Sequence, residues 1–182
     1  AMAERQVTVA GQTLALDDPF LVVATQNPIE QAGTYPLPEA QLDRFMFSVQ
    51  MAYPEKAMEK RVVAEGPAEH AAEIEPVLDG PALAQFADAV TQMPIADDVV
   101  DYAVSLARAT RPDDETSAEM VRHYVAWGAG PRAGQALAAA AKALAAIEGE
   151  PTPGCIHVRR VAPMILRHRL VLSYTATGER IS

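Results

Sequence analysis

The chain has 182 residues, enough for one or two domains, and its 49% hydrophobic and 21% charged residues are typical of an ordinary soluble protein. Fourteen prolines and only 5% aromatic residues favour punctuated helices and disfavour an all-β fold. The net charge of −9 argues against generic nucleic-acid binding, and no apolar run approaches the ~20 residues that a membrane span requires.

The first fifty residues indicate β-structure. Residues 6–16 alternate apolar and polar side chains on both sides of residues 10–12, which predicts a β-hairpin because the central glycine supplies the positive φ of such turns. Residues 20–24, FLVVA, form the unbroken apolar run of a strand buried on both faces of a parallel sheet, and residues 45–51 predict another strand. Two or three short strands cannot form an independent domain, so we expect them to belong to an α/β sheet.

The chain after residue 53 is predicted to be helical, apart from a polar connector at 66–81 that proline and glycine bound. Pro54 suits the first position of a helix, and apolar side chains recur at helical spacing from there on. Pro163 is expected to interrupt or restart the last helix, and Trp127 is expected in the core. The predicted helices cover residues 55–64, 81–92, 97–111, 117–127, 131–148 and 156–172.

The predicted fold class is therefore an α/β remnant with a β-hairpin, followed by an all-α bundle, and mainly α overall. The expected domains are residues 1–53 for the α/β part, 54–80 for a linker helix and connector, and 81–182 for the bundle. The single cysteine, Cys155, excludes an intrachain disulfide, and no signal peptide is expected because no apolar stretch follows a basic one at the N-terminus. Both features indicate a cytoplasmic protein.

Asn27 follows the predicted strand at 20–24, at the carboxyl end where open α/β sheets bind ligands. Pro28 restricts Asn27 to an extended backbone, which would aim its side-chain amide. An amide can donate to a phosphate oxygen and accept from a water at once, which suits the orientation of a nucleophilic water in phosphoryl transfer. An asparagine that only closes a turn is the alternative interpretation.

Arg44 ends a short predicted helix that begins at Pro38 and precedes the strand predicted at 45–51. A cation at this end is favourable for the helix dipole, and Asp43 could pair with it, so a purely structural role is one interpretation. The other interpretation is an arginine finger, a fixed cation presented to the charge that develops on a transferring phosphoryl group.

Arg132 lies at the start of the long alanine-rich helix, directly after Pro131 in GAGPRAG. Free backbone N–H groups and the helix dipole make this end attractive to anions, and Arg132 adds a charged fork. A phosphate contact is therefore one interpretation, although an arginine at a helix N-terminus is also common without any ligand.

Several other kinds of site are excluded or disfavoured. No Gly-x-x-x-x-Gly-Lys-Ser/Thr motif occurs, so the phosphate-binding loop of P-loop proteins is not in the sequence. The acidic pair of LALDD at 14–18 lies on the return arm of the hairpin, with no room for a helix before the next strand, which argues against magnesium binding. The four histidines and Cys155 lack partners at metal-ligand spacing, so no metal site is expected.

Taken together, these segments resemble the MoxR family of AAA+ ATPases. The resemblance is strongest in VVATQNPIEQAGTYPLPEAQLDRFMF at 22–47 and continues through the hairpin, GAGPRAGQAL at 128–137 and VAPMILRHRLVLS at 161–173. It covers nearly the whole chain in the expected order. The fold that it implies is the C-terminal part of a AAA+ (P-loop NTPase) core followed by a helical lid, with the hairpin as the pre-sensor-1 insertion.

The resemblance also implies roles for three residues. Asn27 matches the sensor-1 residue and Arg132 the sensor-2 arginine of the lid, both acting on the ATP of their own subunit. Arg44 matches the arginine finger, which acts on the ATP of the neighbouring subunit. The family usually carries Gly-Ala-Ser-Pro-Arg before the lid helix, and here Gly130 replaces the serine.

The function implied by the resemblance is ATP hydrolysis with Mg²⁺ by a ring, expected to be a hexamer. Such a ring would drive chaperone-like remodelling or maturation of client enzymes. Its expected partners are these clients and von Willebrand factor A domain proteins, and no membrane association is expected. Because the Walker A and Walker B motifs are not in this sequence, the chain alone is expected to be inactive and to bind ATP weakly. A free-standing helical interaction module that docks through the basic segment 159–180 remains an alternative, and a DNA-binding role for that segment is disfavoured by the acidic remainder.

Overall fold

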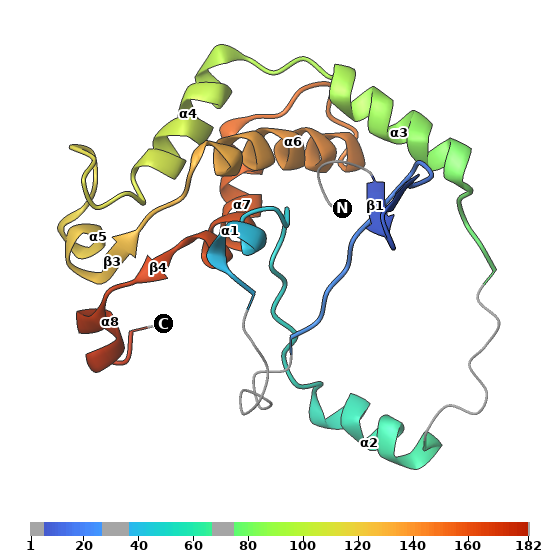
Figure 1. The fold of residues 1–182 in the computed structure, drawn as a ribbon, viewed down its shortest axis with the longest axis horizontal. Coiled ribbons are helices and arrows are strands. Elements are labelled where there is room, and N and C mark those ends of the chain that lie inside the picture. The colour runs from blue at the N-terminus through green and yellow to red at the C-terminus, as the bar shows by residue number, and fades with distance from the viewer. Residues whose placement is uncertain (1–5, 27–36, 67–74, 182) are drawn as a thin grey trace.

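The computed structural model describes residues 6–26, 37–66 and 75–181. Most of its elements are helices, and they enclose one apolar core in the C-terminal part (Figure 1). The elements in chain order are β1 (Gln6–Val9), β2 (Gln12–Ala15), α1 (Glu39–Leu42), α2 (Lys56–Glu65), α3 (Gly80–Gln92), α4 (Asp97–Arg108), α5 (Glu119–Tyr124), β3 (Val125–Trp127), α6 (Pro131–Ile147), α7 (Cys155–Leu166), the 3₁₀ turn η1 (Arg167–Arg169), β4 (Val171–Leu172) and α8 (Tyr174–Gly178).

The core lies where α6 packs against α4 and α7. Alanines on the buried face of α6 allow the neighbouring backbones to approach closely, while Leu137 fills the centre with no exposed surface. Val158 and Ile165 of α7 are likewise fully buried against it. The helices predicted at 55–64, 81–92, 97–111 and 131–148 are therefore confirmed, with small shifts at their ends.

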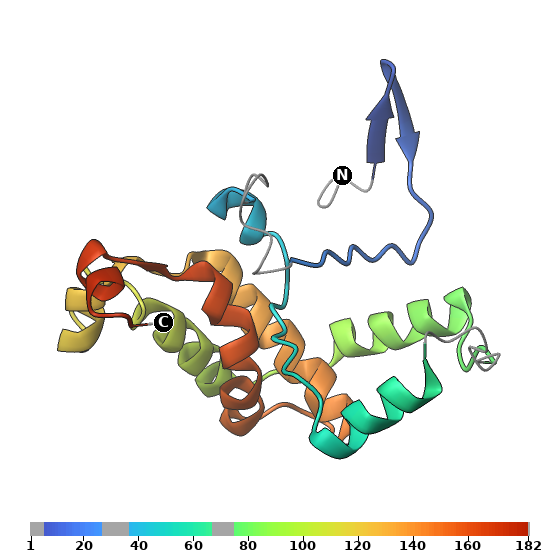
Figure 2. The ribbon, with the colours of Figure 1, turned by 90° about the horizontal axis from the view of Figure 1, so that it is seen from below.

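The predicted hairpin is also confirmed. β1 and β2 pair antiparallel, with Val9 opposite Gln12, and Ala10 and Gly11 both adopt positive φ in the two-residue turn. Figure 2 shows this hairpin standing apart from the helical layer.

The two strands predicted after the hairpin are not formed. Residues 20–26 and 47–55 have no regular secondary structure, and Leu21, Val23 and Val49 expose most of their side-chain surface. A strand requires a hydrogen-bonded neighbour, and the sheets among the described residues consist only of β1 with β2 and β3 with β4. The apolar pattern of 20–24 is therefore present without the sheet that would bury it.

Three further predictions for the C-terminal part were wrong. The helix predicted over 117–127 ends at Tyr124, because the next three residues pair with β4 as strand β3. Trp127 lies on this strand with 73% of its surface exposed, and is not a core residue. Pro163 lies inside α7 without ending it, and the chain leaves the helix only after Leu166. None of the helices in the described ranges is long and apolar enough to cross a membrane.

Candidate functional site

The candidate site lies where the one-turn helix α1 meets the helical bundle. Asp43 directly follows α1, and its carboxylate binds two arginines from distant parts of the chain. Oδ1 accepts from Nε of Arg169 at 2.9 Å, and Oδ2 lies 3.4 Å from Nη1 of Arg132. The residue before Arg44 thus joins α1 to both α6 and η1.

The start of α6, and with it Arg132, is fixed by the loop that follows β3. Nε of Arg111 donates to the Ala129 carbonyl at 2.9 Å, and the Ala129 N–H donates to Oγ1 of Thr110 at 2.9 Å. Gly128 passes so close to the end of α4 that a Cβ at this position would lie 2.6 Å from Cα of Arg111. Only glycine fits there, which gives a physical reason for the first glycine of GAGPRAG.

Arg169 lies beneath the site, with only 3% of its side chain exposed. Besides the Asp43 carboxylate, it donates through Nη2 to the carbonyls of Asp43 at 2.9 Å and Phe45 at 2.7 Å. Nη1 donates to the carbonyl of Ile165 at 2.5 Å, which ties the guanidinium to the end of α7. A buried charge of this kind is tolerated because its donors are met by acceptors.

His168 completes the contact between α7 and the segment after α1. Its Nε2 lies 3.0 Å from the carbonyl oxygen of Phe45. Burial lowers the pKa of this imidazole below its usual value, and the adjacent Arg169 charge acts in the same direction. The ring is therefore mainly neutral at pH 7, and its Nε2 also lies 2.9 Å from Nη1 of Arg169.

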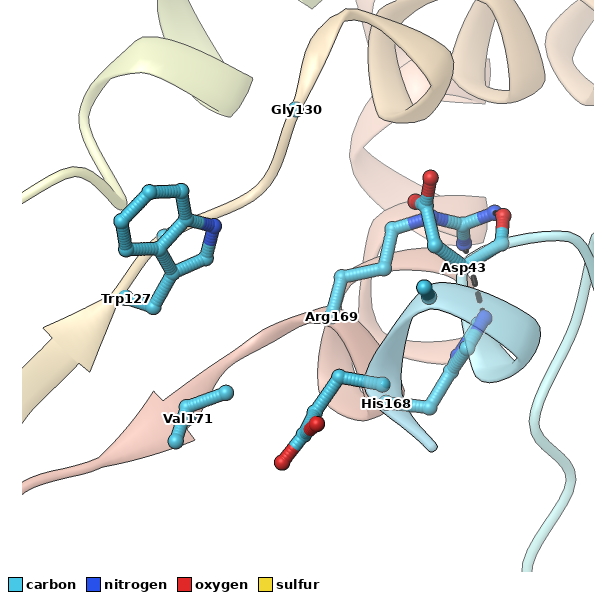
Figure 3. Close-up of a pocket in the computed structure, with 9 residues that line it drawn as sticks. Asp43, Trp127, Gly130, His168, Arg169 and Val171 are labelled. Carbon is cyan, nitrogen blue, oxygen red and sulfur yellow. Dashed lines mark hydrogen bonds and ion pairs between the residues drawn. The ribbon is translucent and has the colours of Figure 1, made fainter. Parts of the chain in front are cut away.

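Two cavities flank Asp43. One of about 330 Å³ is lined by Asp43 and three arginines, Arg44, Arg132 and Arg169, together with Met46, Gln135 and Ala136. The other, of about 250 Å³, lies on the side of Trp127, Gly130 and Val171, with His168 and Arg169 facing it (Figure 3). The first cavity carries the excess of positive charge, which suits an anion.

Of the three predicted site residues, the structure describes Arg44 and Arg132. Arg44 is exposed and follows Asp43, and Arg132 is the second residue of α6 with 53% of its side chain exposed. The structure brings these two arginines to one cavity. Asn27 lies outside the described residues. The part of the chain that the structure describes holds no His, Cys, Asp or Glu cluster able to bind a metal ion.

Sequence reasoning missed Arg169 and considered a different partner for Asp43. Arg44 was one possible partner of Asp43, and the structure shows that the Asp43 carboxylate contacts Arg132 and Arg169. The available signal was RHR at 167–169, a basic group directly after the apolar stretch of α7. RHR lies within the basic segment 159–180, but His168 and Arg169 make contacts inside the protein.

Comparison with protein-family models gives two matches. Residues 1–47 match the ATPase family associated with various cellular activities (AAA), and residues 117–182 match the AAA lid domain. The first match contains the hairpin and α1, and the second contains the elements from α5 to α8.

Related proteins match over nearly the whole chain. Chaperone MoxR1 of Mycobacterium tuberculosis is 38% identical over all of this chain and 48% of its own length, and protein MoxR of Methylorubrum extorquens is 29% identical over 94% and 53%. A crystal structure of a protein provisionally described as an ATPase, from Cytophaga hutchinsonii, superimposes with a TM-score of 0.88 at 36% identity, over 98% of this chain and 55% of that one.

The chain spans about half the length of the curated relatives that it matches. Within that span the matches cover 94% or more of this chain. The chain belongs to the MoxR family of AAA+ ATPases, and it comprises the end of the AAA+ core and the helical lid.

Proposed function

We propose that this chain supplies the arginine side of an ATP-hydrolysis site in a MoxR-type chaperone ATPase. The observation that carries the proposal is the shared cavity of Arg44 and Arg132, which lies at the N-terminus of the 17-residue helix α6. Free N–H groups and the dipole at a helix N-terminus favour anions, and the two guanidinium groups add full charges. The polyphosphate of ATP fits this chemistry.

In phosphoryl transfer, fixed cations stabilise the charge that develops on the transferring group. Arg44 has the exposed position required of a cation that reaches another subunit, and Arg132 would hold the same phosphates from the lid. When bound with ATP, Mg²⁺ would supply further positive charge to the phosphates, and no residue described here is assigned to hold it. Asn27 would order the attacking water.

The shared cavity changes one expectation. The family resemblance assigns Arg132 to the ATP of its own subunit and Arg44 to that of the neighbour. Because both arginines line one cavity, we favour a single nucleotide, held between two subunits, that receives both arginines from the same chain. A ring of identical subunits provides such interfaces.

Mixing variants of the intact protein tests this arrangement. Arg44→Ala and Arg132→Ala should each reduce ATP turnover, with Arg44→Ala losing about 10³-fold or more. If both arginines come from one subunit, every mixed interface still lacks one of them, so rings mixed from the two variants stay inactive. If they serve different nucleotides, some interfaces become complete and turnover returns.

A matched control is Arg61→Ala, which removes an exposed arginine of α2 that pairs only locally with Glu65. Its turnover should equal that of the unmodified protein. Full turnover by Arg44→Ala would contradict the arginine-finger role.

We infer the cellular role of this protein from its family. One relative is named a chaperone, and we propose that this protein also remodels or matures client proteins as a ring. Von Willebrand factor A domain proteins and client enzymes are the proposed partners, in the cytoplasm. Measuring ATPase activity on the 182-residue chain alone checks the expectation that it is inactive without the phosphate-binding loop, and robust hydrolysis would contradict it.

A further inference from the structure

The backbone on both sides of Arg44 is held by one buried side chain. Nη2 of Arg169 donates to the carbonyl of Asp43, the residue before Arg44, at 2.9 Å and to that of Phe45, the residue after it, at 2.7 Å. A single guanidinium nitrogen therefore holds the peptide group directly before Arg44 and the peptide group that follows Phe45.

The same guanidinium is anchored to the lid. Its Nη1 donates to the Ile165 carbonyl at 2.5 Å, and Nε donates to Oδ1 of Asp43 at 2.9 Å. Two neighbouring contacts act alongside it, because the Ser48 N–H donates to the Met164 carbonyl at 2.8 Å and His168 binds the Phe45 carbonyl. Segment 43–48 is thus docked on the C-terminal end of α7.

Helix α1 has little packing of its own to hold Arg44 in place. It is a single turn, Glu39–Leu42, without a buried residue or a side-chain N-cap, and the chain after Phe47 has no regular structure. The polar contacts to α7 and η1 therefore decide where Arg44 is presented. A planar guanidinium can bridge two carbonyls and a carboxylate at once, which a lysine ammonium on a flexible stem cannot reproduce.

We propose that Arg169 is a positioning residue for Arg44, so that the lid sets the direction in which the finger points. The inference rests on the proposed catalytic role of Arg44. Only 3% of the Arg169 side chain is exposed, and its donors bind backbone carbonyls and the Asp43 carboxylate, so it should affect the chemical step more than the binding of ATP.

The test uses Arg169→Lys in the intact protein, with steady-state kinetics of ATP hydrolysis. We expect kcat to fall by about 10²-fold, the order of loss that a displacement of ~1 Å can cause, while KM for ATP changes little. Arg160→Lys is the control, since Arg160 is on α7, the helix that precedes the turn of Arg169, and its partner Glu148 is on the surface. It should leave both constants unchanged.

A double variant separates positioning from a general structural effect. In an Arg44→Ala background, measured under single-turnover conditions because hydrolysis is slow, Arg169→Lys should cause no further loss. An equal loss in both backgrounds, or an unchanged kcat in Arg169→Lys alone, would overturn the proposal. Full turnover by Arg44→Ala would instead overturn the proposed function, and the positioning role with it.

Circular dichroism and thermal melting establish whether each variant is folded. If Arg169→Lys is unfolded, Arg169→Gln takes its place under the same criteria, because its amide keeps two N–H donors without a buried charge. If both variants are unfolded while Arg160→Lys is folded, Arg169 is a residue required for folding and the positioning role is rejected.

Discussion

Arg132 at the start of α6 reaches across to Asp43 at the end of α1, with Nη1 3.4 Å from Oδ2. The other oxygen of the same carboxylate binds Arg169. The two arginines differ in environment, since 53% of the Arg132 side chain is exposed and only 3% of the Arg169 side chain is. The Asp43 carboxylate thus forms one ion pair with a half-exposed arginine and one with a buried arginine.

Removing the charge of Asp43 should therefore cost more stability than removing Arg132. Asp43→Asn weakens the charge-assisted hydrogen bond to a buried guanidinium, which we expect to lower the free energy of unfolding by about 1–3 kcal/mol. Arg132→Ala removes a mostly hydrated ion pair, worth at most about 1 kcal/mol. Urea unfolding of both variants measures the difference, and equal losses would contradict the assignment of Arg169 as the main partner.

The sequence was sufficient to predict those elements whose pattern is local. The hairpin needed only its turn at Ala10 and Gly11, and α6 needed only its proline start and its alanine-rich face. The strand predicted at 20–24 depended on neighbours in a sheet, which local pattern cannot supply. Trp127 was misplaced for a related reason, because its strand is created by pairing with Val171, more than forty residues later.

The residues of the candidate site also separate into those with a local sequence signal and those that depend on distant parts of the chain. Arg44 and Arg132 were found because each follows a recognisable local start or end of a helix, and the structure then placed them at one cavity. Arg169 could not be identified in this way, since its role depends on carbonyl groups of residues more than 120 positions earlier in the chain. Asn27 stays a prediction.

Gly128 should not tolerate a side chain. In Gly128→Ala the new Cβ would overlap the carbonyl oxygen of Thr110, and since that atom belongs to backbone, the loop before α6 must shift. We expect a loss of about 1–3 kcal/mol in the free energy of unfolding. The matched control is Gly134→Ala inside α6, where the new methyl group meets no atom within 4 Å and the helix should gain up to about 1 kcal/mol. Similar melting temperatures for the two variants would contradict the close approach.

Gly130→Ser should stabilise the lid. Gly130 is the N-cap of α6, with an extended backbone and no side chain to accept from the first free N–H groups, and a Cβ there meets open space. Serine is the residue that the family resemblance leads us to expect at this position, and its hydroxyl can cap the helix. The expected gain over glycine is a few tenths of a kcal/mol, visible as a small rise in melting temperature. Gly130→Ala is the control, because it adds a Cβ without the capping oxygen, and an equal rise in that variant would argue against capping.

Acidification should weaken the contact between α7 and the segment after α1, because of His168. Burial lowers the pKa of this histidine below its usual value of 6.5, so in acid the unfolded chain binds the proton before the folded one does. Stability therefore falls as the pH drops through 6.5 towards the folded-state pKa, and is recovered above 6.5. The charged ring would also face Arg169, whose Nη1 lies 2.9 Å from Nε2, and the Asp43 carboxylate would only partly offset this repulsion.

The His168→Gln variant isolates this contribution, since the other histidines are present in both proteins. Unfolding free energies measured from about pH 7.5 down to about pH 5.5 should show the unmodified protein losing stability relative to His168→Gln as the pH falls. Glutamine keeps an N–H donor that can reach the Phe45 carbonyl but does not titrate. Parallel profiles over this range would mean that His168 takes up its proton equally in the folded and unfolded states, and that its burial against Phe45 does not govern the acid sensitivity of the junction.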